Sequence, residues 1–296
     1  MKKPLFRGAN TAMVTPFTWD NKINFSLLGD LIERQIQSGV SALTICGTTG
    51  EKSTLDDKEH KDCLLYAIDK VAGRIPVLAG TGSNDTRYCL QMSRFAASAG
   101  ADGLLLVTPY YNKTTQPGLV RHFLTIADAV DKPIVVYSVP SRTGMGISIE
   151  TYKAISEHPN MNGTKEASGD LELITEIRRT CGDDFNVWSG EDSLIIPALS
   201  LGGQGVISVL SNVMPREVSD ICSLWFEGKT TESAALAIET FDLAKALFLE
   251  TNPIPVKAAL TAMGFDVAEA RMPLTFMSEG NKEKLLAVMR KHHLIP

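Results

Sequence analysis

Short apolar runs, rich in β-branched residues, alternate with longer amphipathic segments along most of this 296-residue chain. Such runs are typical of strands that are buried on both faces, as in parallel sheets. We predict eight strands, at residues 12–15, 42–45, 75–79, 103–107, 134–137, 161–165, 186–188 and 205–209. The alternation of strands with helices indicates an α/β fold.

The segments between the runs carry signals for helix starts and ends. At residues 56–71, Asp56 and Glu59 form the pattern of a capping box, and Gly73 follows the apolar stripe as a stop. Further helices are predicted at residues 148–157 and 170–180 and, after the eighth strand, at 215–227, 231–248, 253–263 and 282–291.

The count of eight strand–helix units favours a closed barrel over an open doubly wound sheet. A TIM barrel typically takes ~250 residues, which this chain exceeds. We therefore predict an α/β fold, a (β/α)8 TIM barrel at residues 1–210 with additional C-terminal helices. These helices would form an extension at residues 211–296 that packs on the barrel.

Charge and cysteine usage limit the partners and the compartment. The net charge of −5 gives no basic face for nucleic acid. The five cysteines are scattered and form no C-x-x-C pair, which argues against disulfides or zinc and fits a reducing compartment. No apolar segment follows the basic start of the chain, and no apolar run approaches the ~20 residues that span a bilayer. We expect a cytoplasmic protein that binds neither nucleic acid nor membrane.

Common cofactor and metal motifs are missing from the sequence. There is no P-loop, no H-E-x-x-H and no G-x-S-x-G, and the Gly80-Thr81-Gly82 segment lacks the third glycine of a dinucleotide fingerprint. We expect no cofactor and no metal, which leaves covalent chemistry without a cofactor, or a pure binding role.

Polar segments follow several predicted strands. They occupy residues 47–51, 108–112, 138–144, 166–169 and 189–192. In a barrel the carboxyl ends of all strands meet on one rim, where active sites are built. We therefore place the candidate site on that rim.

These segments carry a family resemblance that covers nearly the whole chain. G-T-T-G-E at 47–51, T-P-Y-Y-N at 108–112, V-P-S-R-T-G at 139–144 and K-E-A at 165–167 occur in the order of one known family. The chain resembles the class I aldolases that include dihydrodipicolinate synthase, N-acetylneuraminate lyase and 2-keto-3-deoxygluconate aldolase. The resemblance implies a Schiff base of pyruvate, bound covalently as a substrate, on Lys165.

The chemistry suits that assignment. An amine must be unprotonated to attack a ketone, and burial lowers the pKa of a lysine from its usual ~10.4. The resulting protonated imine is an electron sink, so that the pyruvate methyl group can lose a proton and become a nucleophile. By resemblance, Tyr137 transfers protons, with Thr48 and Tyr111 as relay partners. In the family, the equivalent of Tyr111 crosses a tight dimer interface. The resemblance also implies a homotetramer built from two such dimers.

The remaining site residues are also carried over from the resemblance. Thr49 matches the threonine that holds the pyruvate carboxylate, and Gly190 and Ile207 match residues that line the pyruvate pocket. Arg142 matches the arginine that grips the carboxylate of aspartate-4-semialdehyde, a task that suits a guanidinium. The implied reaction condenses pyruvate with L-aspartate-4-semialdehyde to 4-hydroxy-tetrahydrodipicolinate, a precursor of diaminopimelate and lysine.

Four positions depart from the family's pattern. Ser138 stands where asparagine is usual after the tyrosine. Lys52, Asp57 and Tyr88 replace a small residue, a histidine and an acidic residue of the site at which lysine inhibits sensitive enzymes. Losing that acid removes the charge partner of the effector's ammonium. We therefore expect weak or no inhibition by lysine.

Two alternatives to the synthase remain. One is a pyruvate-releasing retro-aldolase acting on a 2-keto-3-deoxy sugar acid or N-acetylneuraminate, against which Arg142 speaks. The other is a non-catalytic barrel that binds keto acids. The presence of both Lys165 and Tyr137 argues against this alternative.

Overall fold

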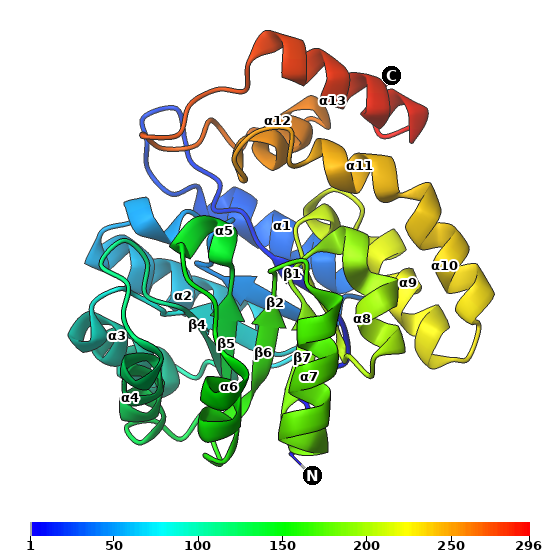
Figure 1. The fold of residues 1–296 in the computed structure, drawn as a ribbon. Helices are drawn as coiled ribbons and strands as arrows, with labels where there is room; N and C mark the ends of the chain where they lie inside the picture. The colour runs from blue at the N-terminus through cyan, green and yellow to red at the C-terminus, as the bar shows by residue number, and fades with distance from the viewer. Residues whose placement is uncertain (1) are drawn as a thin grey trace.

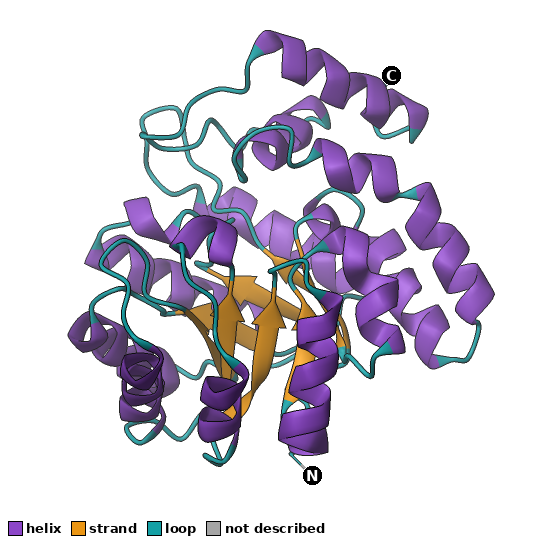
Figure 2. Ribbon diagram, viewed as in Figure 1, coloured by secondary structure: helices purple, strands orange, loops and turns teal. Residues whose placement is uncertain are grey.

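The computed structural model describes residues 2–296. Eight parallel strands form a closed barrel in sequence order, and helices surround it (Figures 1 and 2). The strands are β1 (Gly8–Ala12), β2 (Ala42–Ile45), β3 (Val77–Gly80), β4 (Gly103–Val107), β5 (Ile134–Ser138), β6 (Met161–Glu166), β7 (Asn186–Ser189) and β8 (Gly205–Ser208). The predicted TIM barrel is confirmed.

Seven of the eight predicted strands lie within two residues of their predicted ends, but the first prediction is wrong. Strand β1 covers Gly8–Ala12 rather than residues 12–15. The apolar run was misleading because β1 carries buried polar side chains that bond to residues distant in the sequence, on β2 and on α1 (Phe25–Gln37). Thr44 donates a hydrogen bond to Asn10 at 2.9 Å, and Thr11 donates one to Gln35 at 2.6 Å. Hydrogen bonds of this kind lower the cost of burying polar groups, although Asn10 Nδ2 has no partner among the described residues.

Three outer helices begin where the sequence predicts, and α2 ends at Val71 with Ala72 as its C-cap, just before the predicted stop at Gly73. The capping box of Asp56 and Glu59 is present at α2, and Ser148 and Asp170 are the N-caps of α6 and α7. The helices up to β8 are α1 (Phe25–Gln37), α2 (Asp57–Val71), α3 (Thr86–Ser98), α4 (Gln116–Ala127), α5 (Pro140–Thr143), α6 (Ile149–Ser156), α7 (Leu171–Cys181) and α8 (Ile195–Ser200), with short 3-10 turns at Lys52–Thr54, Gly182–Asp184 and Asp192–Leu194.

After β8, a 3-10 turn at Leu210–Asn212 leads into α9 (Pro215–Phe226), α10 (Thr230–Glu239), α11 (Phe241–Ala246), α12 (Ile254–Ala262) and α13 (Glu279–Lys291). The helix predicted at 231–248 is two helices that meet at Thr240, whose hydroxyl donates a hydrogen bond to the Leu236 carbonyl at 3.0 Å. Helix α9 packs against β1 and takes the place of the eighth barrel helix. The boundary at residue 210 between the barrel and a C-terminal extension stays a prediction.

The last helices lie over the end of the barrel to which the strands point, while the N-terminus lies at the opposite end (Figure 1). The barrel interior between the two ends is packed with side chains. Phe6 and Trp188 stack there with ring centroids 4.9 Å apart, in one cluster with Ile207 and Tyr137. Across residues 2–296, no helix is long and apolar enough to cross a membrane.

Candidate active site

A cavity of about 580 Å³ opens at the carboxyl ends of the strands, below the C-terminal helices. Six of the eight predicted site residues line it: Thr48, Thr49, Tyr137, Arg142, Lys165 and Gly190. They come from the ends of β2, β5, β6 and β7 and from α5, segments that are distant in the sequence. Barrel closure brings these residues together, as expected for a rim built from strand ends.

Lys165 is the buried amine of this cavity. It lies near the end of β6, directly paired with Tyr137 of β5, and only 5% of its surface is exposed. Its Nζ lies 4.3 Å from the centroid of the Tyr137 ring. Burial lowers the pKa of Lys165 to about 8. The negative charge of Asp192 opposes this decrease, and the positive charge of Arg142 adds to it. A substantial fraction of this amine is therefore neutral near physiological pH and able to act as a nucleophile.

Tyr137 is the buried hydroxyl next to that amine. Burial raises the pKa of Tyr137 to about 12, although Arg142 and a hydrogen bond with Thr48 partly offset the rise. The phenol therefore stays protonated while it donates and accepts hydrogen bonds, which suits a group that passes protons. Thr48 is half-buried beside it.

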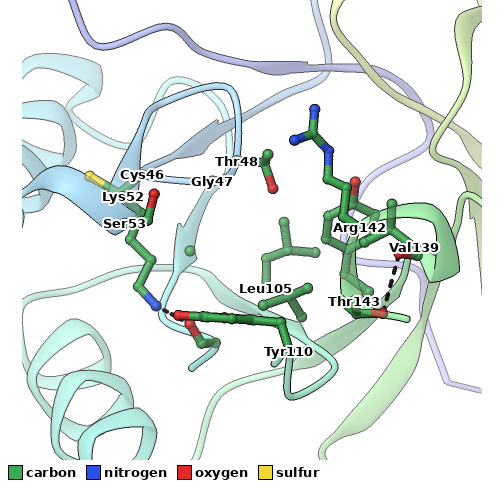
Figure 3. Close-up of a pocket in the computed structure, with 14 residues that line it drawn as sticks. Cys46, Gly47, Thr48, Lys52, Ser53, Leu105, Tyr110, Val139, Arg142 and Thr143 are labelled. Carbon is green, nitrogen blue, oxygen red and sulfur yellow. Dashed lines mark hydrogen bonds between the residues drawn. The ribbon is translucent and has the colours of Figure 1, made fainter. Parts of the chain in front are cut away.

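A second cavity of about 230 Å³ adjoins the first and shares Thr48, Tyr137 and Arg142 with it. Figure 3 shows Lys52 on one side of it, Arg142 on the other and the Tyr110 ring between them, with the hydroxyl toward Lys52.

Tyr111 lines neither cavity of its own chain. Its side chain is 92% exposed and its φ is +67°, a conformation that is uncommon for a bulky residue. The single chain therefore does not bring Tyr111 to Tyr137 and Thr48.

Asn252 connects the two candidate carboxylate-binding residues. Its Nδ2 donates a hydrogen bond to Thr49 Oγ1 at 2.9 Å, and its backbone oxygen accepts one from Arg142 Nη2 at 3.0 Å. Because Thr49 Oγ1 accepts from Asn252, its own O–H remains available for an anion in the cavity. Asn252 was given no role from the sequence, where it begins the segment N-P-I-P-V-K at residues 252–257.

A buried ion pair anchors the loop that carries Thr48 and Thr49. Glu51 Oε1 lies 2.6 Å from Lys257 Nζ on α12, and both side chains are 2% exposed. The other carboxylate oxygen of Glu51 accepts from the backbone N–H of Arg271 at 2.7 Å. Lys257 and Arg271 of the C-terminal segment thus hold the loop through Glu51, while Asn252, which lines the cavity, holds it through Thr49.

Gly190 and Ile207 occupy different surroundings. A Cβ on Gly190 would lie 2.6 Å from Ala167 Cβ and 3.1 Å from Lys165 Cε, so that only glycine leaves room for the reactive side chain. Ile207 is fully buried in the packed barrel interior and does not line the cavity.

Ser138 is also fully buried and does not line the cavity. It pairs with Glu166, one position beyond the pair of Tyr137 and Lys165. Its effect on the site is therefore indirect.

Asp192 is a buried carboxylate in the cavity wall to which the sequence had assigned no role. It lies in the polar segment after β7, and that position was the available signal. It accepts hydrogen bonds from the backbone N–H groups of Val209 and Leu210 at 3.0 and 2.9 Å, and from the Ser208 hydroxyl.

Within residues 2–296, no group of three or more His, Cys, Asp or Glu side chains is placed to hold a metal ion.

Comparison with known proteins points to one family. The model of the Dihydrodipicolinate synthetase family matches residues 5–292. Proteins named 4-hydroxy-tetrahydrodipicolinate synthase are 50% identical in Clostridium tetani, over 98% of this chain and 99% of that protein, and 49% identical in a Thermoanaerobacter species, over 99% and 98%.

Solved structures agree with this assignment. Dihydrodipicolinate synthase from Aquifex aeolicus has a TM-score of 0.95 and 44% identity, over 98% of this chain and 99% of that one. A structure described as the first monomeric dihydrodipicolinate synthase variant has a TM-score of 0.96 and 42% identity, over 98% of both chains. The predicted family and the prediction of an enzyme are confirmed. The chain belongs to the dihydrodipicolinate synthetase family.

Proposed function

We propose that this enzyme is a lyase that condenses pyruvate with L-aspartate-4-semialdehyde to give 4-hydroxy-tetrahydrodipicolinate, in the pathway to diaminopimelate and lysine. The observation that carries this proposal is a buried amine of lowered pKa, Lys165, facing Tyr137 in a cavity that also holds Thr49 and Arg142. The names of the relatives supply the reaction, and the cavity supplies groups for each step.

The first half of the reaction makes a nucleophile from pyruvate. The neutral Lys165 nitrogen attacks the ketone carbon, and the carbinolamine loses water to give a protonated imine. Thr49 donates its free O–H to the carboxylate, and Tyr137 passes the protons that addition and water loss require. The imine then draws electrons from the methyl carbon, which loses a proton to leave an enamine.

The second half forms the carbon–carbon bond. The enamine carbon attacks the aldehyde of aspartate semialdehyde, and Tyr137 protonates the resulting alkoxide. The amino group of the semialdehyde then attacks the imine carbon and closes the ring, which releases the Lys165 amine. Arg142, exposed at the cavity mouth, is suited to hold the carboxylate of the second substrate because a guanidinium can bind it with two parallel N–H donors.

We also propose that Tyr111 completes the site of a second copy of the chain. Tyr111 projects from the surface, while the smaller cavity beside Tyr137 and Thr48 has the mainly apolar lining that an aromatic ring would fill. Such an exchange gives a tight dimer, and two dimers give the homotetramer that the family resemblance implies. No cofactor takes part, because pyruvate itself becomes the electron sink.

Borohydride reduction in the presence of pyruvate, followed by peptide mass mapping, tests the proposal. Reduction should fix a pyruvate-derived adduct on the peptide that contains Lys165, and Lys165→Ala should abolish it. Lys257 is a matched internal control, since it is a buried lysine whose ammonium is paired with Glu51. An adduct together with turnover of a sugar acid but not of aspartate semialdehyde would refute the synthase assignment and leave the lysine assignment intact.

A further inference from the structure

Covalent chemistry on Lys165 creates a charge that the cavity must accommodate. Once the amine has formed the protonated imine, a positive charge is held in a buried site, where an unpaired charge is unfavourable. Pyruvate brings one carboxylate, and Arg142 adds a further positive charge at the mouth. A carboxylate of the protein near the nitrogen would balance these charges.

Three carboxylates line the cavity, and two of them are engaged elsewhere. Glu250 accepts hydrogen bonds from the Ser278 backbone N–H at 3.0 Å and from Asn281 at 2.9 Å. Glu191 is only half-buried and interacts with the exposed Lys245 of α11. Asp192 is the buried one.

The hydrogen bonds of Asp192 keep its carboxylate charged. Two of its partners, the backbone N–H groups of Val209 and Leu210, can only donate. The third, Ser208 Oγ, already accepts from the Ser211 N–H at 2.9 Å and so turns its own proton to Asp192. Burial raises the pKa of Asp192, but these bonds and the charge of Lys165 oppose the rise. Hydrogen bonds to the ionised form favour that form.

We propose that Asp192 is a positioning residue that acts through its charge, the buried counter-ion of the nitrogen on Lys165 in its ammonium and protonated-imine states. This inference rests on the proposed function. The ionisable groups that face Asp192 are Lys165 from β6, Cys222 from α9 and the adjacent Glu191, with Arg142 and Lys245 farther along the cavity wall.

Asp192→Asn tests the role by removing the charge and keeping the shape. Without the anion, the ammonium of Lys165 is less stable, so that the amine becomes neutral at lower pH. The pH at which the rate of pyruvate trapping is half-maximal should fall by about one unit, a tenfold change in proton affinity. At the same time kcat/KM for pyruvate should fall about tenfold or more, because the protonated imine loses the same stabilisation. A purely structural role would not move the pH profile.

Glu191→Gln is the matched control, since it removes a carboxylate from the next residue of the same wall. Its shift should be clearly smaller, and an equal shift would overturn the assignment to Asp192. A folded Asp192→Asn variant with an unchanged profile would overturn it as well. If Asp192→Asn does not fold, Ser208→Ala is the test. Loss of the Ser208 hydroxyl, a hydrogen-bond donor to Asp192, should move the pH profile of pyruvate trapping in the same direction by a smaller amount. An unchanged pH profile in this variant would count against the role of Asp192.

The two proposals fail in different ways. If the unmodified enzyme forms no adduct on Lys165, the proposed function is wrong. If it forms the adduct and the Asp192 and Ser208 variants trap pyruvate with the same pH profile, only the role of Asp192 is wrong.

Discussion

Tyr137 and Lys165 are directly paired on the neighbouring strands β5 and β6, and the lysine nitrogen lies 4.3 Å from the centroid of the tyrosine ring. This pairing fixes the distance between the expected nucleophile and the expected proton-transfer group through backbone hydrogen bonds of the barrel. Both side chains are buried, so that burial lowers the pKa of one and raises the pKa of the other. Near pH 8 the amine can therefore be neutral while the phenol keeps its proton.

The rate of pyruvate trapping should depend on pH through Lys165. The rate rises with pH as the ammonium loses its proton and levels off above about 8, the lowered pKa. An ordinary lysine, with a pKa of ~10.4, would still gain rate well beyond that point. Borohydride trapping at a series of pH values measures the profile, with Lys165→Ala as the blank. A midpoint near 10 would show that the amine is not buried as described.

Replacing the Tyr137 hydroxyl should slow catalysis without unfolding the protein. Tyr137→Phe keeps the ring in the packed cluster of the barrel interior and removes the proton-transfer group. We expect kcat to fall by about 10²–10⁴, the range for loss of general acid–base catalysis. Tyr66→Phe, on α2 and packed against Phe25, is the control and should change kcat little. Steady-state kinetics decides, and equal kcat values for both variants would refute the role.

Arg142 should matter for the second substrate more than for the first. Arg142→Ala removes a charged donor at the cavity mouth, and a hydrogen bond to a charged group contributes about 1.5–3 kcal/mol. We expect KM for aspartate semialdehyde to rise about tenfold or more, while pyruvate is still trapped on Lys165. Arg121→Ala, an exposed arginine of α4, serves as control. A comparable loss of pyruvate trapping would show that Arg142 does not select the second substrate.

Lysine should inhibit the enzyme weakly or not at all. The side chain of Lys52 donates a hydrogen bond to the Gly82 carbonyl, and its Nζ lies 5.8 Å from the centroid of the Tyr88 ring. An ammonium of the protein therefore already occupies this region, and the effector's ammonium would meet a like charge there. Activity measured over a lysine series up to millimolar concentrations tests the expectation. Strong inhibition in that range contradicts it.

The buried pair of Glu51 and Lys257 should be important for stability. Lys257→Met leaves a carboxylate buried without its partner, which typically costs about 3–5 kcal/mol. The double variant Glu51→Gln/Lys257→Met removes both charges and should recover much of the loss. Lys282→Met, at an exposed lysine, is the control. Urea unfolding gives the free energies, and a single variant as stable as the control would contradict the prediction.

Local sequence signals predicted most of the fold. Strand β2 and strand β4 have their predicted bounds, and the capping box of Asp56 and Glu59 begins α2 as expected. These features depend on neighbouring residues, so that a short stretch of sequence contains them. Strand β1 was misplaced because its buried Asn10 and Thr11 bond to Thr44 and Gln35, partners that no local pattern reveals.

The sequence by itself determined the strand–helix alternation and, through its motifs, which lysine, tyrosine, threonines and arginine would carry the chemistry. Only the tertiary structure decided that Asn252 joins Thr49 to Arg142, that Lys257 pairs with Glu51, and that Asp192 lies buried in the same cavity wall as Lys165. The first two relationships join residues more than a hundred positions apart. The lowered pKa of Lys165 arises chiefly from burial, and burial exists only after the barrel has closed and the C-terminal helices have covered its mouth.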